Sequence, residues 1–112
     1  MAFCAEFTRG SVETIILHLL RERTMYGYEI IKLVNERTEG AFAWKEGSLY
    51  PCLHRMECAG VIAGEWLEGD TPGKPRKYYK LTHKGEAHAR EKVAEWQAFS
   101  RAMGAILAVQ SI

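Results

Sequence analysis

The sequence has few of the features that mark membrane or secreted proteins. Its 112 residues contain no apolar run that approaches the roughly 20 residues of a membrane-spanning helix. The three cysteines form no C-x-x-C pair, and an odd number indicates reduced thiols. Glu6 and Arg9 interrupt the stretch where a signal peptide would need an apolar region. The sequence therefore predicts a cytoplasmic protein.

The motifs of enzyme active sites and metal centres are also missing. No glycine-rich phosphate loop, nucleophile elbow or catalytic carboxylate pair occurs. Cys52 and His54 would lie about 200° apart on a helix, and His54 with Cys58 supplies only two metal ligands. We expect no enzyme activity, no metal and no cofactor. Cys58 is either a thiol sensor or an inert small side chain.

The chain as a whole has almost no net charge, but one segment is strongly basic. The formal net charge is only +1, and the length fits one domain with an accessory element. From Thr71 to Gly85 the sequence has basic residues and no Asp or Glu. The basic residues are Lys74, Arg76, Lys77, Lys80 and Lys84. This local patch, and not the total charge, indicates a nucleic-acid partner.

The stretch from Gly47 to Gly60 predicts an amphipathic helix. Ser48 suits the N-cap, Pro51 then falls in the first turn, and Gly60 ends the helix at the C′ position. One side is apolar and is expected to be buried: Leu49, Leu53 and Met56. The residues expected to face away are Ser48, Pro51, His54, Arg55 and Cys58.

A β-hairpin is predicted after this helix. Val61-Ile62 and Trp66-Leu67 precede a loop of turn-forming residues, and Tyr78-Tyr79 follows it. Alternation places Arg76, Tyr78 and Lys80 on the outer side. Residues 41–45, with Phe42 and Trp44, are expected to add a third edge strand. A polar helix face beside a basic hairpin is what a winged helix-turn-helix needs.

Two helices are predicted ahead of this unit. Ser11 caps the first, which ends near Arg23, and Thr24 caps the second, which Gly40 closes. Gly27 is expected to permit close approach of another backbone. Its neighbours Tyr26 and Tyr28 either contact a phosphate or pack as core. Residues 1–10, with Phe3 and Phe7, form either a short helix or a frayed end.

From Thr82 onward the pattern predicts one long helix. Its apolar stripe spans about 140° of arc and consists of Ala89, Val93, Trp96, Phe99, Met103, Ile106 and Leu107. The opposite side carries small residues: Ala94, Ala98, Ala102, Ala105 and Val109. Two apolar sides on one terminal helix predict a partner chain, and a homodimer is the economical answer. Phe3 and Phe7 are expected to pack over this interface.

Three ordered runs resemble the PadR-like transcriptional regulators. They are residues 26–30, residues 47–51 with Leu53, Arg55, Glu57, Gly60 and Trp66, and residues 73–82 with Gly85. The resemblance covers roughly residues 11–85. It implies a dimeric winged-helix repressor that binds DNA and has no enzymatic activity. Glu29 and Arg55 belong to the family's pattern, and a structural ion pair between them is expected.

The sequence thus predicts a mainly α, α+β fold, with a winged helix-turn-helix domain in residues 1–82 and a dimerisation helix in residues 83–112. The residues expected at the major groove are Ser48, Tyr50, His54 and Arg55. Those expected on phosphates or in the adjacent minor groove are Lys74, Arg76 and Lys77, with Tyr26 as a further DNA contact. A homodimer would hold two recognition helices about 34 Å apart on a palindromic operator. The alternative is a protein interaction module that binds no DNA.

A small aromatic effector is a further hypothesis. Trp96 lies in the middle of the apolar stripe, so a nearby two-fold axis would bring two indoles face to face, flanked by Val93, Phe99 and Met103. A planar aromatic molecule would fit between them. The alternative is that Trp96 is interface core alone.

Overall fold

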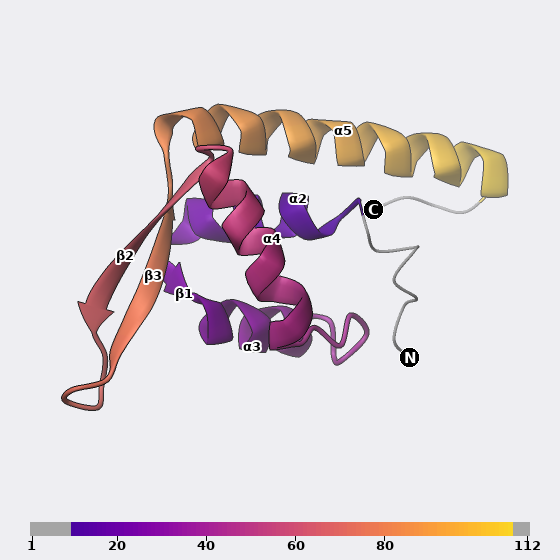
Figure 1. Ribbon diagram of the computed structural model, residues 1–112. Coiled ribbons are helices and arrows are strands. Elements are labelled where there is room, and N and C mark those ends of the chain that lie inside the picture. The colour runs from indigo at the N-terminus through magenta and orange to yellow at the C-terminus, as the bar shows by residue number, and fades with distance from the viewer. Residues whose placement is uncertain (1–9, 109–112) are drawn as a thin grey trace.

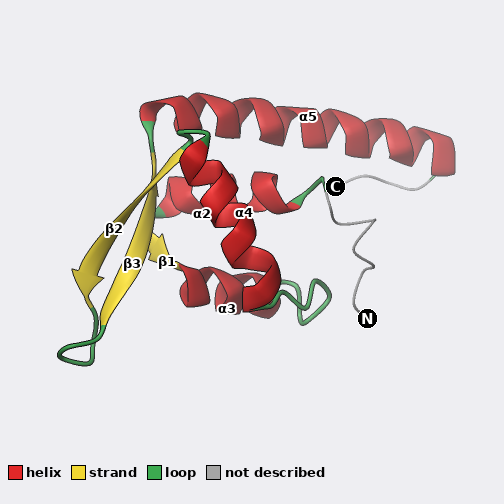
Figure 2. Cartoon of the chain, viewed as in Figure 1, coloured by secondary structure: helices red, strands yellow, loops and turns green. Residues whose placement is uncertain are grey.

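Four helices and a three-stranded sheet make up residues 10–108, the part of the chain that the computed structural model describes (Figures 1 and 2). The helices are α2 (Val12–Glu22), α3 (Gly27–Arg37), α4 (Glu46–Cys58) and α5 (His83–Leu107). The strands are β1 (Met25–Tyr26), β2 (Ile62–Glu68) and β3 (Pro75–Leu81). The expectations for Phe3 and Phe7 lie outside the described residues. The predicted mainly α winged-helix fold is confirmed.

Helix α2 begins after Ser11, as predicted, and supplies the centre of the core. Ile16, Leu17, Leu19 and Leu20 are buried, because the apolar positions recur at helical spacing. They pack with the buried sides of α3 and α4 in one cluster. No helix among residues 10–108 is long and apolar enough to cross a membrane.

The third strand of the sheet is β1, and not residues 41–45 as the sequence predicted. Met25 pairs with Tyr79 and Tyr26 pairs with Tyr78, which gives the antiparallel order β1-β3-β2. Because residues 25 and 26 are extended, α3 starts at Gly27 with Tyr26 as its N-cap. The prediction that Thr24 caps this helix was therefore wrong.

Residues 41–45 form a loop because a side chain occupies the backbone groups that a strand would use. The Asn35 amide donates to the carbonyl oxygen of Trp44 at 3.1 Å, and its own oxygen accepts the Trp44 N–H at 2.8 Å. The rings of Phe42 and Trp44 stack with centroids 6.4 Å apart and pack against the core. The loop is thus anchored on α3.

Helix α4 starts three residues earlier than predicted. Lys45 is its N-cap, and the Lys45 carbonyl accepts the N–H groups of Ser48 and Leu49, each at 3.1 Å. Pro51 consequently lies inside the helix and not in its first turn. Because proline has no N–H, the carbonyl of Gly47 lacks its helical hydrogen bond. Gly47 is exposed, so a water molecule can donate to that carbonyl instead.

The end of α4 agrees with the prediction. Gly60 takes the left-handed conformation, with φ +78°. Its N–H donates to Glu57 O at 3.0 Å, and the Val61 N–H donates to Met56 O at 3.2 Å, which is a Schellman motif. The chain then enters the predicted hairpin, in which β2 and β3 pair from Ile62 with Leu81 to Glu68 with Pro75.

The start of α5 is bound to the end of α4. Thr82 caps α5 by accepting the Gly85 N–H at 3.0 Å, and its hydroxyl donates to Gly60 O at 2.6 Å. Lys84 Nζ donates to Ala59 O at 2.9 Å. Gly85 lies so close to the Val61 carbonyl that any Cβ would collide with it. These contacts fix where the long helix leaves the domain.

Helix α5 lies along α2 and then projects beyond it (Figure 1). Two polar contacts join the helices: His88 Nε2 lies 3.0 Å from Glu13 Oε1, and Arg21 Nε lies 3.2 Å from Glu86 Oε1. Of the predicted apolar stripe, Ala89 is buried and Val93 is half-buried. The rest of the stripe is exposed within a single chain: Trp96, Phe99, Met103, Ile106 and Leu107.

Candidate nucleic-acid interface

Helix α4 has one buried side and one polar exposed side, as the sequence predicted. Leu49, Leu53 and Met56 are buried, and Cys52 is buried with them. Ser48, His54 and Arg55 are exposed on the other side, where a DNA groove could be contacted. The expected ion pair between Glu29 and Arg55 is wrong, because Glu29 pairs with Arg23. Glu29 also accepts the Tyr26 N–H at 3.4 Å, which ties it to the start of α3.

Glu57 and Lys77 join α4 to the hairpin, and we call this pair the wing clamp. Lys77 Nζ lies 2.9 Å from Glu57 Oε1, and the Gly64 N–H donates to the other oxygen at 3.2 Å. The hydrogen bond from Lys77 holds the pKa of Glu57 below its ordinary value, and the same bond raises the pKa of Lys77. A Cβ at Gly64 would collide with the Lys77 stem. The charge of Lys77, a predicted phosphate contact, is already paired.

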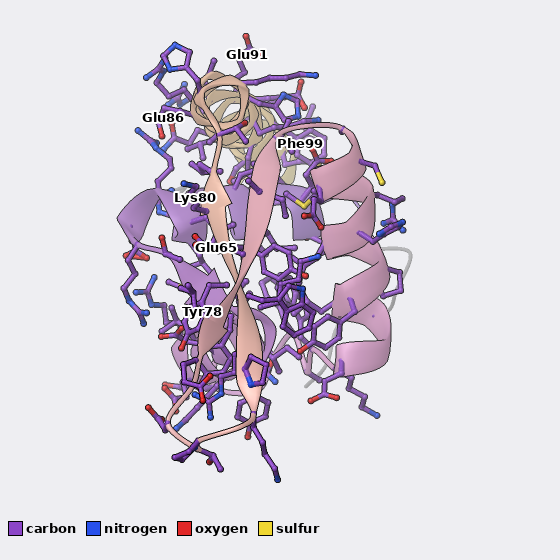
Figure 3. All side chains as sticks on the ribbon, turned by 60° about the vertical axis from the view of Figure 1, so that its left-hand side comes forward. Glu65, Tyr78, Lys80, Glu86, Glu91 and Phe99 are labelled. Atoms are coloured by element: carbon purple, nitrogen blue, oxygen red, sulfur yellow. The ribbon has the colours of Figure 1, made fainter. Side chains whose placement is uncertain are left out.

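Arg76 is held by aromatic rings and keeps its charge. Its guanidinium carbon lies 4.4 Å from the centre of the Tyr26 ring, and Tyr26 meets Tyr78 edge to face with centroids 5.3 Å apart. Asp70 Oδ2 lies 3.4 Å away, but the Asp70 side chain is 94% exposed, so this ion pair is weakened by water. Tyr78 and Lys80 are labelled beside the hairpin in Figure 3. Lys74 and Lys80 are exposed.

The turn between β2 and β3 has a defined shape. The Gly73 N–H donates to Glu68 Oε1 at 2.8 Å, and Gly73 has φ +80°. This left-handed conformation is one that glycine adopts without steric cost. Lys74 directly follows and is presented at the tip of the hairpin, the wing of the winged-helix fold.

Tyr50 lies across the start of α3. A Cβ at Gly27 would approach the Tyr50 ring to 2.7 Å, so Gly27 makes room for a side chain and not for a backbone as predicted. Burial raises the pKa of the Tyr50 phenol. The hydroxyl is therefore protonated at neutral pH and can donate a hydrogen bond.

A hollow of about 340 Å³ separates the wing from the two helices, and we call it the wing hollow. It is lined by Tyr26, Gly27, Tyr28, Tyr50, Trp66, Pro75, Arg76 and Lys77. The sequence predicted DNA-contact roles for Tyr26, Tyr50, Arg76 and Lys77, and the structure brings these four together. Sequence reasoning missed Trp66 as a site residue, since its position beside α3 depends on the pairing of β1 with β3.

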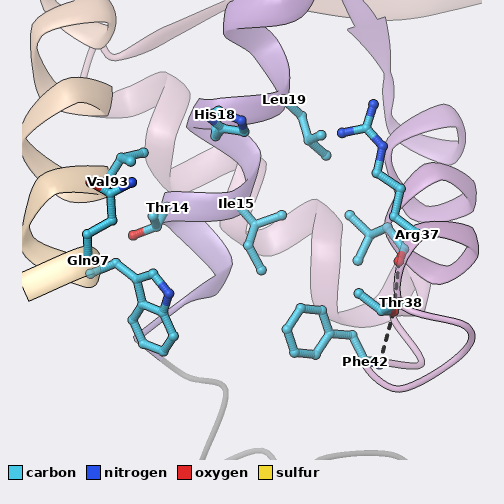
Figure 4. Close-up of a pocket in the computed structure, with 11 residues that line it drawn as sticks. Thr14, Ile15, His18, Leu19, Arg37, Thr38, Phe42, Val93 and Gln97 are labelled. Carbon is cyan, nitrogen blue, oxygen red and sulfur yellow. Dashed lines mark hydrogen bonds between the residues drawn. The ribbon is translucent and has the colours of Figure 1, made fainter. Parts of the chain in front are cut away.

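A second hollow, of about 380 Å³, lies between α2, α3 and α5 (Figure 4). Its walls are mainly apolar and include Ile15, Leu19, Val34 and Phe42. Of the four predicted effector residues, Val93 and Trp96 line this hollow. Phe99 and Met103 lie farther along α5 and are exposed. The ring centroids of Phe99 and Trp96 are 5.9 Å apart.

The two cysteines in the described part of the chain lie in different surroundings. Cys52 is buried, and burial raises the pKa of its thiol, so it is unreactive. Cys58 is exposed on α4, with Sγ 3.7 Å from His54 Nε2. Among residues 10–108, no group of three or more His, Cys, Asp or Glu side chains is arranged to hold a metal ion.

Comparison with known proteins identifies the family. The model of the transcriptional regulator PadR-like family matches residues 16–91. A transcriptional regulator of Mycobacterium tuberculosis is 33% identical over 86 residues, which cover 77% of this chain and 76% of that protein.

Two solved structures extend the similarity to the fold. A transcriptional regulator from Clostridium thermocellum superposes with a TM-score of 0.80 at 35% identity, covering 88% of this chain and 95% of that one. A PadR-like regulator from Bacillus cereus gives a TM-score of 0.80 at 30% identity, covering 94% and 99%. Members of this family are DNA-binding transcriptional regulators and not enzymes. This protein belongs to the PadR-like family of transcriptional regulators.

Proposed function

We propose that this protein is a homodimeric repressor that binds a palindromic DNA operator through α4 and the wing. The observation that carries the proposal is the polar side of α4 beside a basic hairpin, with the wing clamp holding the two together at 2.9 Å. A helix that enters the major groove needs a second contact on the flanking strand to fix its register. The wing supplies that contact.

The DNA-contacting residues divide between the two grooves. Ser48, His54 and Arg55 face the major groove, because they share the exposed side of α4. Lys74 and Arg76 bind phosphates or enter the adjacent minor groove, because both retain cationic charge. Lys77 contributes chiefly through the wing clamp. Tyr26 and Tyr50 lie beside the DNA backbone that separates the two grooves.

Dimerisation through α5 is supported by what a single chain leaves exposed. The exposed fractions are 49% for Trp96, 55% for Phe99 and 83% for Ile106. A contiguous apolar stripe of this kind is rarely left in water by a monomer. A two-fold axis along residues 83–112 would cover the stripe and present two copies of the 1–82 domain to successive turns of DNA.

An aromatic effector would act through the same helix. Trp96 is half-exposed and lines the hollow between α2, α3 and α5, so a planar molecule bound there would contact both the DNA-binding domain and the dimerisation helix. Such a ligand changes operator affinity only to the extent that it favours one arrangement of the two domains.

Selection of bound duplexes from a random pool tests the main proposal. The expected product is one palindromic sequence with half-sites about one helical turn apart. A variant in which Lys74 and Arg76 are both replaced by Ala serves as the matched control. It is expected to select the same palindromic sequence with much weaker enrichment. Recovery of no preferred sequence, together with no salt-dependent binding, would favour a protein interaction module instead.

A further inference from the structure

Phe42 connects the hollow between α2, α3 and α5 with the start of α4. Its side chain lines the hollow, where Figure 4 shows it beside Thr38. Its ring also stacks on that of Trp44, with the centroids 6.4 Å apart and the two planes 20° apart. Trp44 directly precedes Lys45, the N-cap of α4. We call residues 42–45 the entry loop, because they lead from the wall of the hollow into the helix.

The entry loop is held at both of its ends. At one end, the Phe42 N–H donates to the Thr38 hydroxyl at 3.5 Å. At the other end, the Asn35 side chain makes two hydrogen bonds with the backbone of Trp44. Between them Ala43 has a φ of +51°, in the left-handed region that a residue with a Cβ disfavours. Such a conformation persists only while the surrounding contacts enforce it. We therefore expect a displaced Phe42 ring to move Trp44 as well.

The first turn of α4 is only loosely joined to the rest of the helix. Pro51 has no N–H, so the Gly47 carbonyl lacks the bond that would connect the first turn to the second. A helix interrupted by proline bends at that point. The far end of α4 is held to α5 by Thr82 and Lys84. The part of α4 that can shift is therefore its first turn, which carries Ser48, a proposed major-groove contact.

The walls of the hollow determine what an occupant moves. Most lining residues belong to the three helices, whose buried sides are packed in the core. Phe42 lies on a loop, so it is the part of the wall that can yield. Resting on the effector proposed above, we infer that an occupant displaces the Phe42 ring and, through Trp44, moves the first turn of α4 and weakens operator binding. This route lies within one protomer, and it acts in addition to any change in the arrangement of the two domains.

A larger side chain inside the hollow tests this route without a ligand. Ile15 on α2 lines the hollow and is only half-buried, so the ring introduced by Ile15→Phe can extend into it. Ile15→Leu is the matched control, because it keeps the volume of the side chain and adds no ring. Ile15→Leu should behave as the wild type does in every measurement.

Fluorine NMR reports on the hollow and on the entry loop separately. Labelling with fluorotryptophan gives one signal for each of the three tryptophans, and Trp→Phe variants assign them. In Ile15→Phe the signal of Trp96 should shift, because Trp96 lines the hollow. The signal of Trp44 should shift with it. Affinity for the selected operator duplex should fall about fivefold.

Two background substitutions locate the route. In a Phe42→Ala background the added ring has room, so Ile15→Phe should still shift the Trp96 signal but should change neither the Trp44 signal nor operator affinity. In a Pro51→Ala background, residue 51 gains an N–H that can donate to the Gly47 carbonyl and join the first turn to the rest of α4. Ile15→Phe should then shift the Trp44 signal but lower operator affinity less. Melting temperatures check that every variant is folded.

The outcomes separate this inference from the proposed function. If the wild type binds no duplex, the proposed function fails, and this inference fails with it. If the wild type binds and Ile15→Phe leaves the Trp44 signal or the operator affinity unchanged, only the inference is wrong. Naphthol, an uncharged planar aromatic probe, should reproduce the effects of Ile15→Phe when added to the wild type. If Ile15→Phe has these effects and naphthol has none, the route is supported and only the aromatic effector is wrong.

Discussion

Lys77 on β3 binds Glu57 on α4, with Nζ and Oε1 2.9 Å apart and each side chain about 30% exposed. The contact connects a strand of the wing to the last turn of α4, and the Gly64 N–H on β2 donates a second hydrogen bond to the same carboxylate. One carboxylate thus contacts both strands of the wing from α4.

The Glu57→Gln variant should bind DNA several-fold more weakly than the wild type. Removing a negative charge from a DNA-binding surface ordinarily strengthens binding, so a loss can only come from the wing clamp. Lys77→Ala is expected to show a similar loss with little change in the salt dependence of binding. Tighter binding by Glu57→Gln in fluorescence anisotropy titrations would mean that Lys77 is available to phosphate.

Lys74→Ala is expected to behave differently from the clamp variants. Lys74 is exposed at the wing tip, so its loss should weaken binding to all duplexes and reduce the slope of log affinity against log salt by about one. Titrations at several salt concentrations measure this slope. A slope equal to that of the wild type would remove the wing tip from the mechanism.

Stability should fall in acid partly through Glu57. Its pKa is lowered in the folded chain from the ordinary value of 4.5, so its carboxylate stabilises the fold above pH 4.5. This contribution is lost as the pH falls through the lower folded pKa. The expected size is about 1 kcal/mol or less, because the pair is partly exposed to water. Urea unfolding as a function of pH should show a flatter acid limb in Glu57→Gln, and an unchanged limb would contradict the assignment.

The effect of Gly27→Ala should depend on Tyr50. In the wild type the new methyl group meets the Tyr50 ring and displaces it, which offsets the gain of about 1 kcal/mol in helix propensity. In a Tyr50→Ala background the same change should raise the melting temperature. A double-mutant cycle gives the coupling, and additive effects would show that the ring is free to move.

Phe99→Glu should disrupt the proposed dimer, because it places a charge in the middle of the exposed stripe of α5. Sedimentation velocity should then show a smaller particle than the wild type. Arg101→Glu, on the exposed remainder of the same helix, is the control and should keep the wild-type size. A wild-type protein that sediments as a monomer would refute the interface.

Planar aromatic compounds should quench the fluorescence of the wild type and shift its operator affinity if the effector hypothesis holds. A differential binding energy of about 1.4 kcal/mol between the two arrangements corresponds to a tenfold shift. Trp96→Leu should abolish both responses. A panel of compounds without effect on the wild type would leave Trp96 as packing alone.

The parts of the fold that depend on local pattern were predictable from the sequence. The buried sides of α2 and α4 follow from helical periodicity, and the end of α4 follows from Gly60. The hairpin follows from alternation and turn residues. These signals lie within a few residues of one another, so no tertiary information is needed.

The errors involve contacts between distant residues. The pairing of Met25 and Tyr26 with β3 spans more than fifty positions, and nothing local marks a two-residue strand. The sequence predicted an ion pair between Glu29 and Arg55, but the short turn after α2 brings Arg23 close to Glu29 instead. For the same reason, the wing hollow and the neutralised charge of Lys77 became visible only in the folded chain.

The junction between α4 and α5 has a mechanical consequence. Three successive carbonyls at the end of α4, those of Ala59, Gly60 and Val61, are bound by Lys84 and Thr82 at the start of α5. These bonds join α4 and α5 rigidly, so the junction does not act as a hinge. In the proposed dimer, a rotation of one α5 relative to the other would therefore move the two α4 helices with it and change the distance between them.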